Sequence, residues 1–105
     1  MGYLDDVEPS VKVLLKSRGL FLRERADDSP PDVIILVCWD DGYDGGLPVG
    51  TVKLESYRRT FIAHARTDFT ITAAPEVARD LPDVNEAIRQ VLLHLTPRYL
   101  APRDS

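Results

Sequence analysis

The sequence predicts a two-layer α+β fold in which a four- or five-stranded, mainly antiparallel sheet is packed by an N-terminal and a C-terminal amphipathic helix. Three observations lead to this prediction. Apolar residues recur at helical spacing near both ends of the chain, β-rich segments lie between them, and the connections are too short for crossover helices. Two amphipathic helices bury their apolar stripes most simply against one face of such a sheet.

The first helix is expected from about Asp5 to Arg18. Asp5 and Glu8 have the spacing of a capping box, and Gly19 supplies a left-handed stop. Pro9 as the first helical residue is an equally good boundary. The predicted core stripe comprises Leu4, Val7, Val11, Leu14 and Leu15.

The middle of the chain has the pattern of strands joined by turns. Alternation from Leu20 to Arg25 predicts a strand exposed on one face, and Pro30 and Pro31 place a turn after it. The apolar run from Val33 to Trp39 is typical of a central strand. A loop at Asp40–Gly46, with Pro48 close behind, precedes an alternating strand from Val49 to Arg58.

Two further short strands are predicted at Phe61–Arg66 and Phe69–Ala73, or one long strand with a bulge. Ala74–Leu81 is ambiguous, and Pro75–Arg79 fits one helical turn.

The last helix begins at a second capping box, formed by Asp83 and Glu86, and ends before Pro97. Its apolar stripe consists of Val84, Ala87, Ile88, Val91, Leu92 and Leu95. Residues 97–105 are expected to form a short tail of a single domain that spans residues 1–105, because 105 residues suit one core.

Composition excludes several classes of function. The net charge is −4 with no basic block, which argues against a nucleic-acid partner. One cysteine cannot form an intrachain disulfide, and Met1–Glu8 has no apolar signal core, so a cytoplasmic location is expected. The longest apolar run, Val33–Trp39, is too short to span a bilayer, so no membrane partner is expected.

No motif predicts catalysis, a metal or a cofactor. The loop from Asp40 resembles a calcium loop superficially, but Gly42 replaces a ligand and Thr51 replaces the bidentate glutamate. A nucleophilic site at Cys38 would need His64 on a neighbouring strand, which nothing in the sequence requires.

Misplaced apolar residues and the aspartate loop are the candidate partner-binding residues. By helical geometry, Leu93 and Val13 face away from the core stripes of their helices. An equally good alternative is that the tail folds back to cover Leu93. The candidate set is Val13, Trp39, Asp40, Asp41, Tyr43, Asp44, Leu93, Tyr99 and Leu100.

The function expected from these features is non-catalytic protein–protein interaction, in a homo-oligomer or a larger assembly. In outline, the helix–sheet–helix order is similar to small assembly and adaptor proteins, and loosely to the tail-terminator subunits of phages, although no residue motif is shared. The alternative is a small acidic inhibitor, such as an immunity protein or antitoxin, that masks a basic site. A small Cys/His enzyme ranks third.

Overall fold

Five strands in sequence order form one antiparallel sheet, β1-β2-β3-β4-β5. The structure, a computed structural model, describes residues 3–24, 32–40, 46–55, 57–68 and 74–99. The strands are β1 (Leu20–Glu24), β2 (Val33–Trp39), β3 (Leu47–Glu55), β4 (Thr60–Ala65) and β5 (Glu76–Leu81). The helical elements are η1 (Tyr3–Asp6), α1 (Pro9–Ser17), α2 (Val84–His94) and η2 (Pro97–Tyr99).

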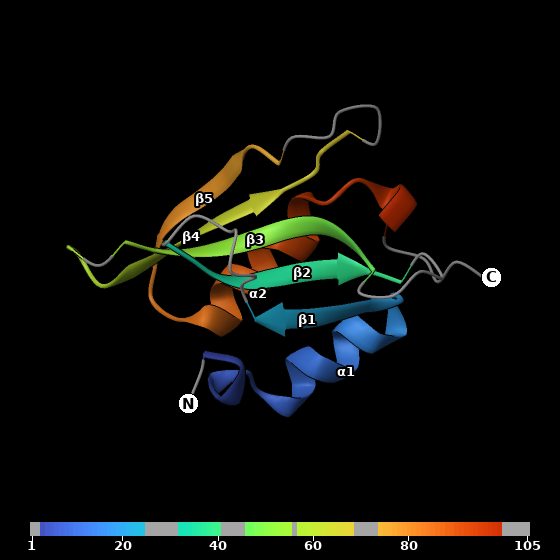
Figure 1. Ribbon diagram of the computed structural model, residues 1–105, viewed down its shortest axis with the longest axis horizontal. Helices are drawn as coiled ribbons and strands as arrows, with labels where there is room; N and C mark the ends of the chain where they lie inside the picture. Colours follow the sequence, from blue (N-terminus) through green and yellow to red (C-terminus); the bar gives the residue numbers. More distant parts are fainter. Residues whose placement is uncertain (1–2, 25–31, 41–45, 56, 69–73, 100–105) are drawn as a thin grey trace.

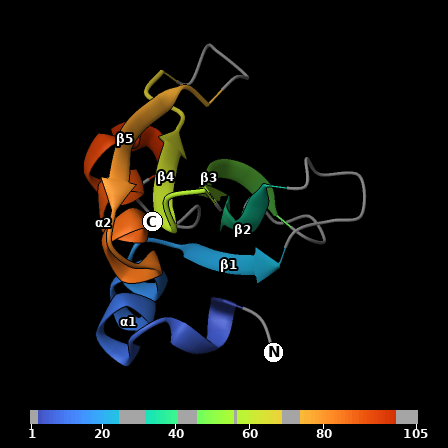
Figure 2. The same cartoon turned by 90° about the vertical axis from the view of Figure 1, so that its left-hand side faces the viewer.

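Both α-helices pack on the same side of the sheet (Figures 1 and 2), which confirms the predicted two-layer α+β class. Helix α1 lies beside β1, and α2 crosses β3, β4 and β5. Figure 2 also shows how strongly the sheet twists, because β4 and β5 stand almost upright while β1 runs across the view. Within the described residues, no helix has both the length and the apolar character needed to cross a membrane.

The start of the first helix differs from the Asp5–Arg18 prediction. Helix α1 begins at Pro9, with Glu8 as its N-cap and no side-chain cap hydrogen bond, so the Asp5–Glu8 capping box is wrong. Pro9 lacks an N–H that would be unsatisfied in the first turn, which makes it a favourable first residue. The predicted stop is confirmed, because Gly19 has φ +72° and donates to the Lys16 carbonyl oxygen at 3.1 Å.

Strand β5 corrects the helical turn considered for Pro75–Arg79. Its pairing with β4 shifts register between Phe61 and Ala63 and again between Ala63 and His64, and Asp80 has φ +59°. At each shift β5 has one extra residue, which forms a bulge and breaks the alternation that identifies a strand. Glu76 and Arg79 form hydrogen bonds of 2.9 and 2.6 Å within this irregular segment. The predicted strand at 69–73 lies outside the described residues.

The other strand boundaries shift by only a few residues. Strand β2 has the predicted bounds, whereas β3 begins at Leu47 and includes Pro48, which the sequence assigned to the loop. Pro48 is tolerated because it is near the start of the strand, beside a register shift between Val37 and Cys38.

The main core lies between the sheet and α2. Ile88 and Val91 have no exposed surface, and both project from α2 toward the strands. A Cβ atom built on Gly50 of β3 would lie 2.5 Å from Val91 Cγ1 and 2.9 Å from the His64 carbonyl oxygen. The missing side chain at Gly50 therefore allows α2 to approach the middle of the sheet closely.

Asn85 is the one buried polar residue in the part of the chain that the structure describes. Its Oδ1 accepts a hydrogen bond from the Glu8 backbone N–H at 2.7 Å, and its Nδ2 donates to the Asp6 carbonyl oxygen at 3.1 Å. These bonds fasten the start of α1 to the start of α2, and Leu14 and Leu93 near the other ends line one groove, so the two helices run side by side in the same direction.

Replacing Ile88 by alanine should lower the free energy of unfolding by about 2–5 kcal/mol, because the change leaves a cavity in the core. Chemical denaturation measures the effect. The control is Arg89→Ala on the exposed side of the same helix. This variant should change the free energy of unfolding by less than about 0.5 kcal/mol. Equal losses in the two variants would contradict the packing of α2.

Asn85→Leu should lower the free energy of unfolding by about 1–3 kcal/mol, since it removes the side-chain partners of the Asp6 carbonyl and the Glu8 N–H. Gln90→Leu is the matched control, because the side-chain partner of Gln90 among the described residues is Glu86, one turn away on the same helix. That variant should lose less than about 0.5 kcal/mol. Denaturation curves that coincide for the parent and Asn85→Leu would refute the role of this side chain.

Candidate functional site

Two of the predicted partner-binding residues pack against each other. The rings of Trp39 and Tyr99 meet edge to face, with centroids 5.4 Å apart. Tyr99 is only 5% exposed, so η2 folds back onto the end of β2 and Tyr99 belongs to the core instead of an open surface. The tail does fold back as the alternative proposed, but in the described residues it covers Trp39 and leaves Leu93 uncovered.

Little of the aspartate loop belongs to the described part of the chain. Asp40 is exposed, and its backbone N–H donates to the Gly19 carbonyl oxygen at 3.0 Å. The remaining candidates Asp41, Tyr43, Asp44 and Leu100 lie outside the described residues.

The apolar residues that helical geometry places outside the core are indeed exposed. Leu93 of α2 is 73% exposed and Val13 of α1 is 69% exposed. The sequence did not predict the exposure of Leu14, which it assigned to the core stripe of the first helix. Leu14 is 38% exposed, because only Val11 and Leu15 of α1 turn fully inward.

Leu93 and Leu14, but not Val13, line a groove between the two helices. The groove measures about 380 Å³ and is lined by Leu14, Arg18, Arg89, Leu92 and Leu93, which together we call the α1–α2 groove. Leu92 is half-buried at its base, although the sequence placed it in the core stripe. Sequence reasoning missed Arg18 and Arg89, since their position follows from how the two helices lie side by side.

Two arginines line the α1–α2 groove, and acidic residues lie beside one of them. Arg89 bridges to Glu8 at 3.2 Å and to Glu86 at 3.7 Å, and all three side chains are partly exposed. Arg18 forms no ion pair among the described residues. Exposed pairs of this kind contribute little stability, so these charges remain available to a partner.

The strand order separates the Cys38 and His64 side chains. Cys38 is in β2 and pairs with Pro48, whereas His64 is in β4 and pairs with Thr51 of β3. The two residues are therefore two strands apart, roughly 10 Å at ordinary strand spacing. Proton transfer between them would need direct hydrogen-bond contact.

Each of these side chains has a structural environment of its own. Cys38 has no exposed surface and packs with Val33 and Leu36 on the sheet face opposite the helices. Burial raises the pKa of its thiol, and the Arg23 guanidinium partly offsets that rise. The His64 Nδ1–H donates to the Ala74 carbonyl oxygen at 2.9 Å, which holds the ring beside the start of β5. Among the described residues, no group of three or more His, Cys, Asp or Glu side chains could hold a metal ion.

Comparisons with protein-family models, with curated proteins and with solved structures found no match to this chain.

Cys38 should react slowly with a thiol reagent in the native protein at neutral pH and rapidly after denaturation. The reason is that burial raises its pKa and limits access to the sulfur atom. Absorbance after addition of an aromatic disulfide reagent measures both rates, and the denatured sample serves as the control. Equal rates would contradict the buried position of this side chain and would favour an enzyme.

Proposed function

We propose that this chain is a non-catalytic protein-binding domain that associates with further copies of itself through the α1–α2 groove. The observation that carries the proposal is the meeting of exposed leucines from two helices. Leu93 and Leu14 line the same groove. Contiguous exposed apolar surface is typical of an interaction site, because burial of that surface drives association.

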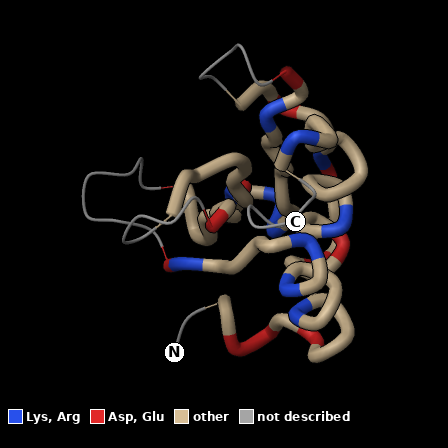
Figure 3. Tube along the Cα trace, turned by 90° about the vertical axis from the view of Figure 1, so that its right-hand side faces the viewer, with Lys and Arg blue, Asp and Glu red and all other residues tan. Residues whose placement is uncertain are grey.

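A second copy is the occupant that best fits the charges. In a two-fold contact the same patch meets itself, so each contact between a residue of one copy and a residue of the other occurs twice. Arg18 and Arg89 line the groove, and Glu8 and Glu86 lie beside Arg89, so opposite charges can pair across such a contact. Figure 3 shows blue and red positions mixed along the helical side of the molecule. The single buried cysteine suits a reducing compartment, which supports a cytoplasmic location.

The second candidate is a small acidic inhibitor that masks a basic site on a target. It is supported by the net charge of −4 and by the exposed acidic residues Asp5, Asp6 and Asp40. Such a protein acts as a single chain until it meets its target, so its mass in solution separates the two candidates.

Leu93→Asp should convert the assembly to single chains of 11.8 kDa without loss of fold. A carboxylate is costly to desolvate in an apolar contact, whereas Leu93 is 73% exposed in the single chain, so its replacement should leave the core intact. Size exclusion with light scattering measures the mass, and circular dichroism reports the fold.

Tyr57→Asp is the matched control, because Tyr57 is 96% exposed in the turn between β3 and β4, away from the helices. This variant should keep the parental mass. A parent protein that already runs as one chain would refute self-association and favour the inhibitor. A Leu93→Asp variant with the parental mass would show that association, if present, uses another surface.

A further inference from the structure

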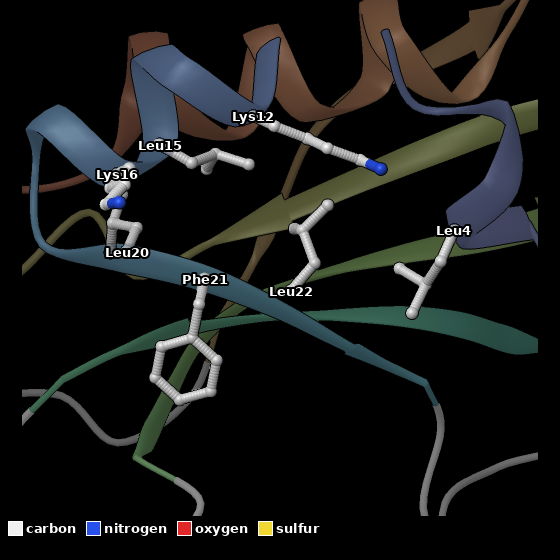
Figure 4. A pocket seen from close by; sticks show the side chains of 7 residues that line it. All are labelled: Leu4, Lys12, Leu15, Lys16, Leu20, Phe21 and Leu22. Carbon is white, nitrogen blue, oxygen red and sulfur yellow. The ribbon is translucent and has the colours of Figure 1, made fainter. Parts of the chain in front are cut away.

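A second and larger groove lies on the other flank of α1, between that helix and β1. It measures about 500 Å³, and its apolar lining includes Leu4, Leu15, Phe21 and Leu22 (Figure 4). Side chains alternate between the two faces of a strand, so Phe21 and Leu22 point to opposite faces of β1. A groove that touches both residues therefore lies over the outer edge of the sheet.

The backbone of β1 is open along part of this edge. The Gly19 carbonyl oxygen accepts from the opposed Asp40 N–H. Since hydrogen-bonded pairs alternate in an antiparallel ladder, the odd-numbered residues of β1 bond to β2 and the even-numbered ones turn outward. Leu20 is buried, but Leu22 is half-buried and Glu24 is exposed, and no backbone partner for their outward groups occurs in the described residues.

The opposite wall of the groove is basic. Lys12 and Lys16 project from α1 one turn apart, and α1 contains no acidic residue. Neither lysine forms an ion pair with a described residue. Figure 4 shows the Lys12 side chain reaching along the groove above Leu22.

We propose that an extended peptide segment of another protein, with acidic residues alternating with apolar ones, adds to the outer edge of β1 in this groove. Alternate residues of a strand are roughly 6.6 Å apart, and helix residues one turn apart have Cβ atoms about 5–6 Å apart. Two acidic side chains on one face of the added strand therefore match Lys12 and Lys16. The apolar residues between them point to the opposite face, where Phe21 lies.

Backbone hydrogen bonds and side chains have different roles in this mode of binding. The outward N–H and C=O groups of Leu22 and Glu24 would pair with the backbone of any extended segment, which gives affinity. The lysines select for acidic residues and exclude basic ones. The site uses the opposite flank of α1 from the α1–α2 groove, so it does not depend on self-association.

The probe is a fluorescein-labelled, C-terminally amidated hexapeptide of alternating glutamate and valine, measured by fluorescence anisotropy at low salt. The double variant Lys12→Glu/Lys16→Glu should bind it at least about tenfold more weakly than the parent, because two attractive contacts become repulsive. Lys53→Glu is the control, because it makes one of the same lysine-to-glutamate changes on β3, outside the groove, and it should retain parental affinity. Binding that survives the double variant overturns the proposal.

Glu24→Pro tests the strand edge independently of the lysines. It removes an outward N–H and leaves the bonds from β1 to β2, and proline is tolerated on an edge strand. Peptide affinity should fall while circular dichroism stays unchanged, and this variant decides the question if the double variant does not fold. A probe methylated on alternate backbone nitrogens should also bind more weakly.

Three other probes can overturn the proposal. Equal binding of a lysine–valine hexapeptide would show that charge does not select the occupant. Equal binding of the methylated probe would show that no strand is added. If laurate binds in the groove and the glutamate–valine peptide does not, the groove is a site for small amphiphilic carboxylates. Leu93→Asp should leave peptide affinity unchanged, so this proposal and self-association succeed or fail separately.

Discussion

The two hydrogen bonds of Asn85 determine where α1 lies, and both candidate surfaces depend on that position. A helix as short as α1 has little stability of its own, so tertiary contacts must hold it in place. Val11 and Leu15 provide apolar contact with the core, but such packing is non-directional. The amide of Asn85 adds direction, because its donor and acceptor meet one particular carbonyl and one particular N–H at the start of α1. The start of α1 is thereby held against the start of α2.

Helix α1 forms one wall of two different grooves as a result. On one flank, Leu14 and Arg18 face α2, and on the other, Lys12 and Lys16 face the outer edge of β1. The chemistry of the flanks differs, since the first combines apolar surface with charges of both signs and the second combines apolar surface with positive charge alone. Any change that displaces α1 would alter both surfaces together. A single nine-residue helix can thus serve two kinds of contact.

The sequence predicts an element well where its local signals agree, and poorly where contacts with distant residues determine its structure. Helix α2 has a capping residue, an uninterrupted stripe and a terminating proline, and its bounds follow from these alone. Strand β5 was missed because the irregular pairing around Asp80 breaks the two-residue alternation that identifies a strand. Leu14 has the sequence spacing of a core residue, yet it lies in the α1–α2 groove because α2 packs beside α1. The exposure of Val13 and Leu93 was predictable from helix geometry, whereas the α1–β1 groove was not, since the sequence does not say which strand is at the edge.

The contact between the two helices has a consequence for how the chain folds during synthesis. Each strand pairs with its neighbour in sequence, so the sheet can assemble progressively as the chain leaves the ribosome. Helix α1 emerges before the sheet, yet its polar partner Asn85 lies 77 residues beyond Glu8 and emerges after strand β5. Until then, Val11 and Leu15 lack the layer that buries them, and the newly made helix is open to wrong partners or to proteases. Helix α1, which borders both candidate surfaces, therefore waits longest during synthesis for its native contacts.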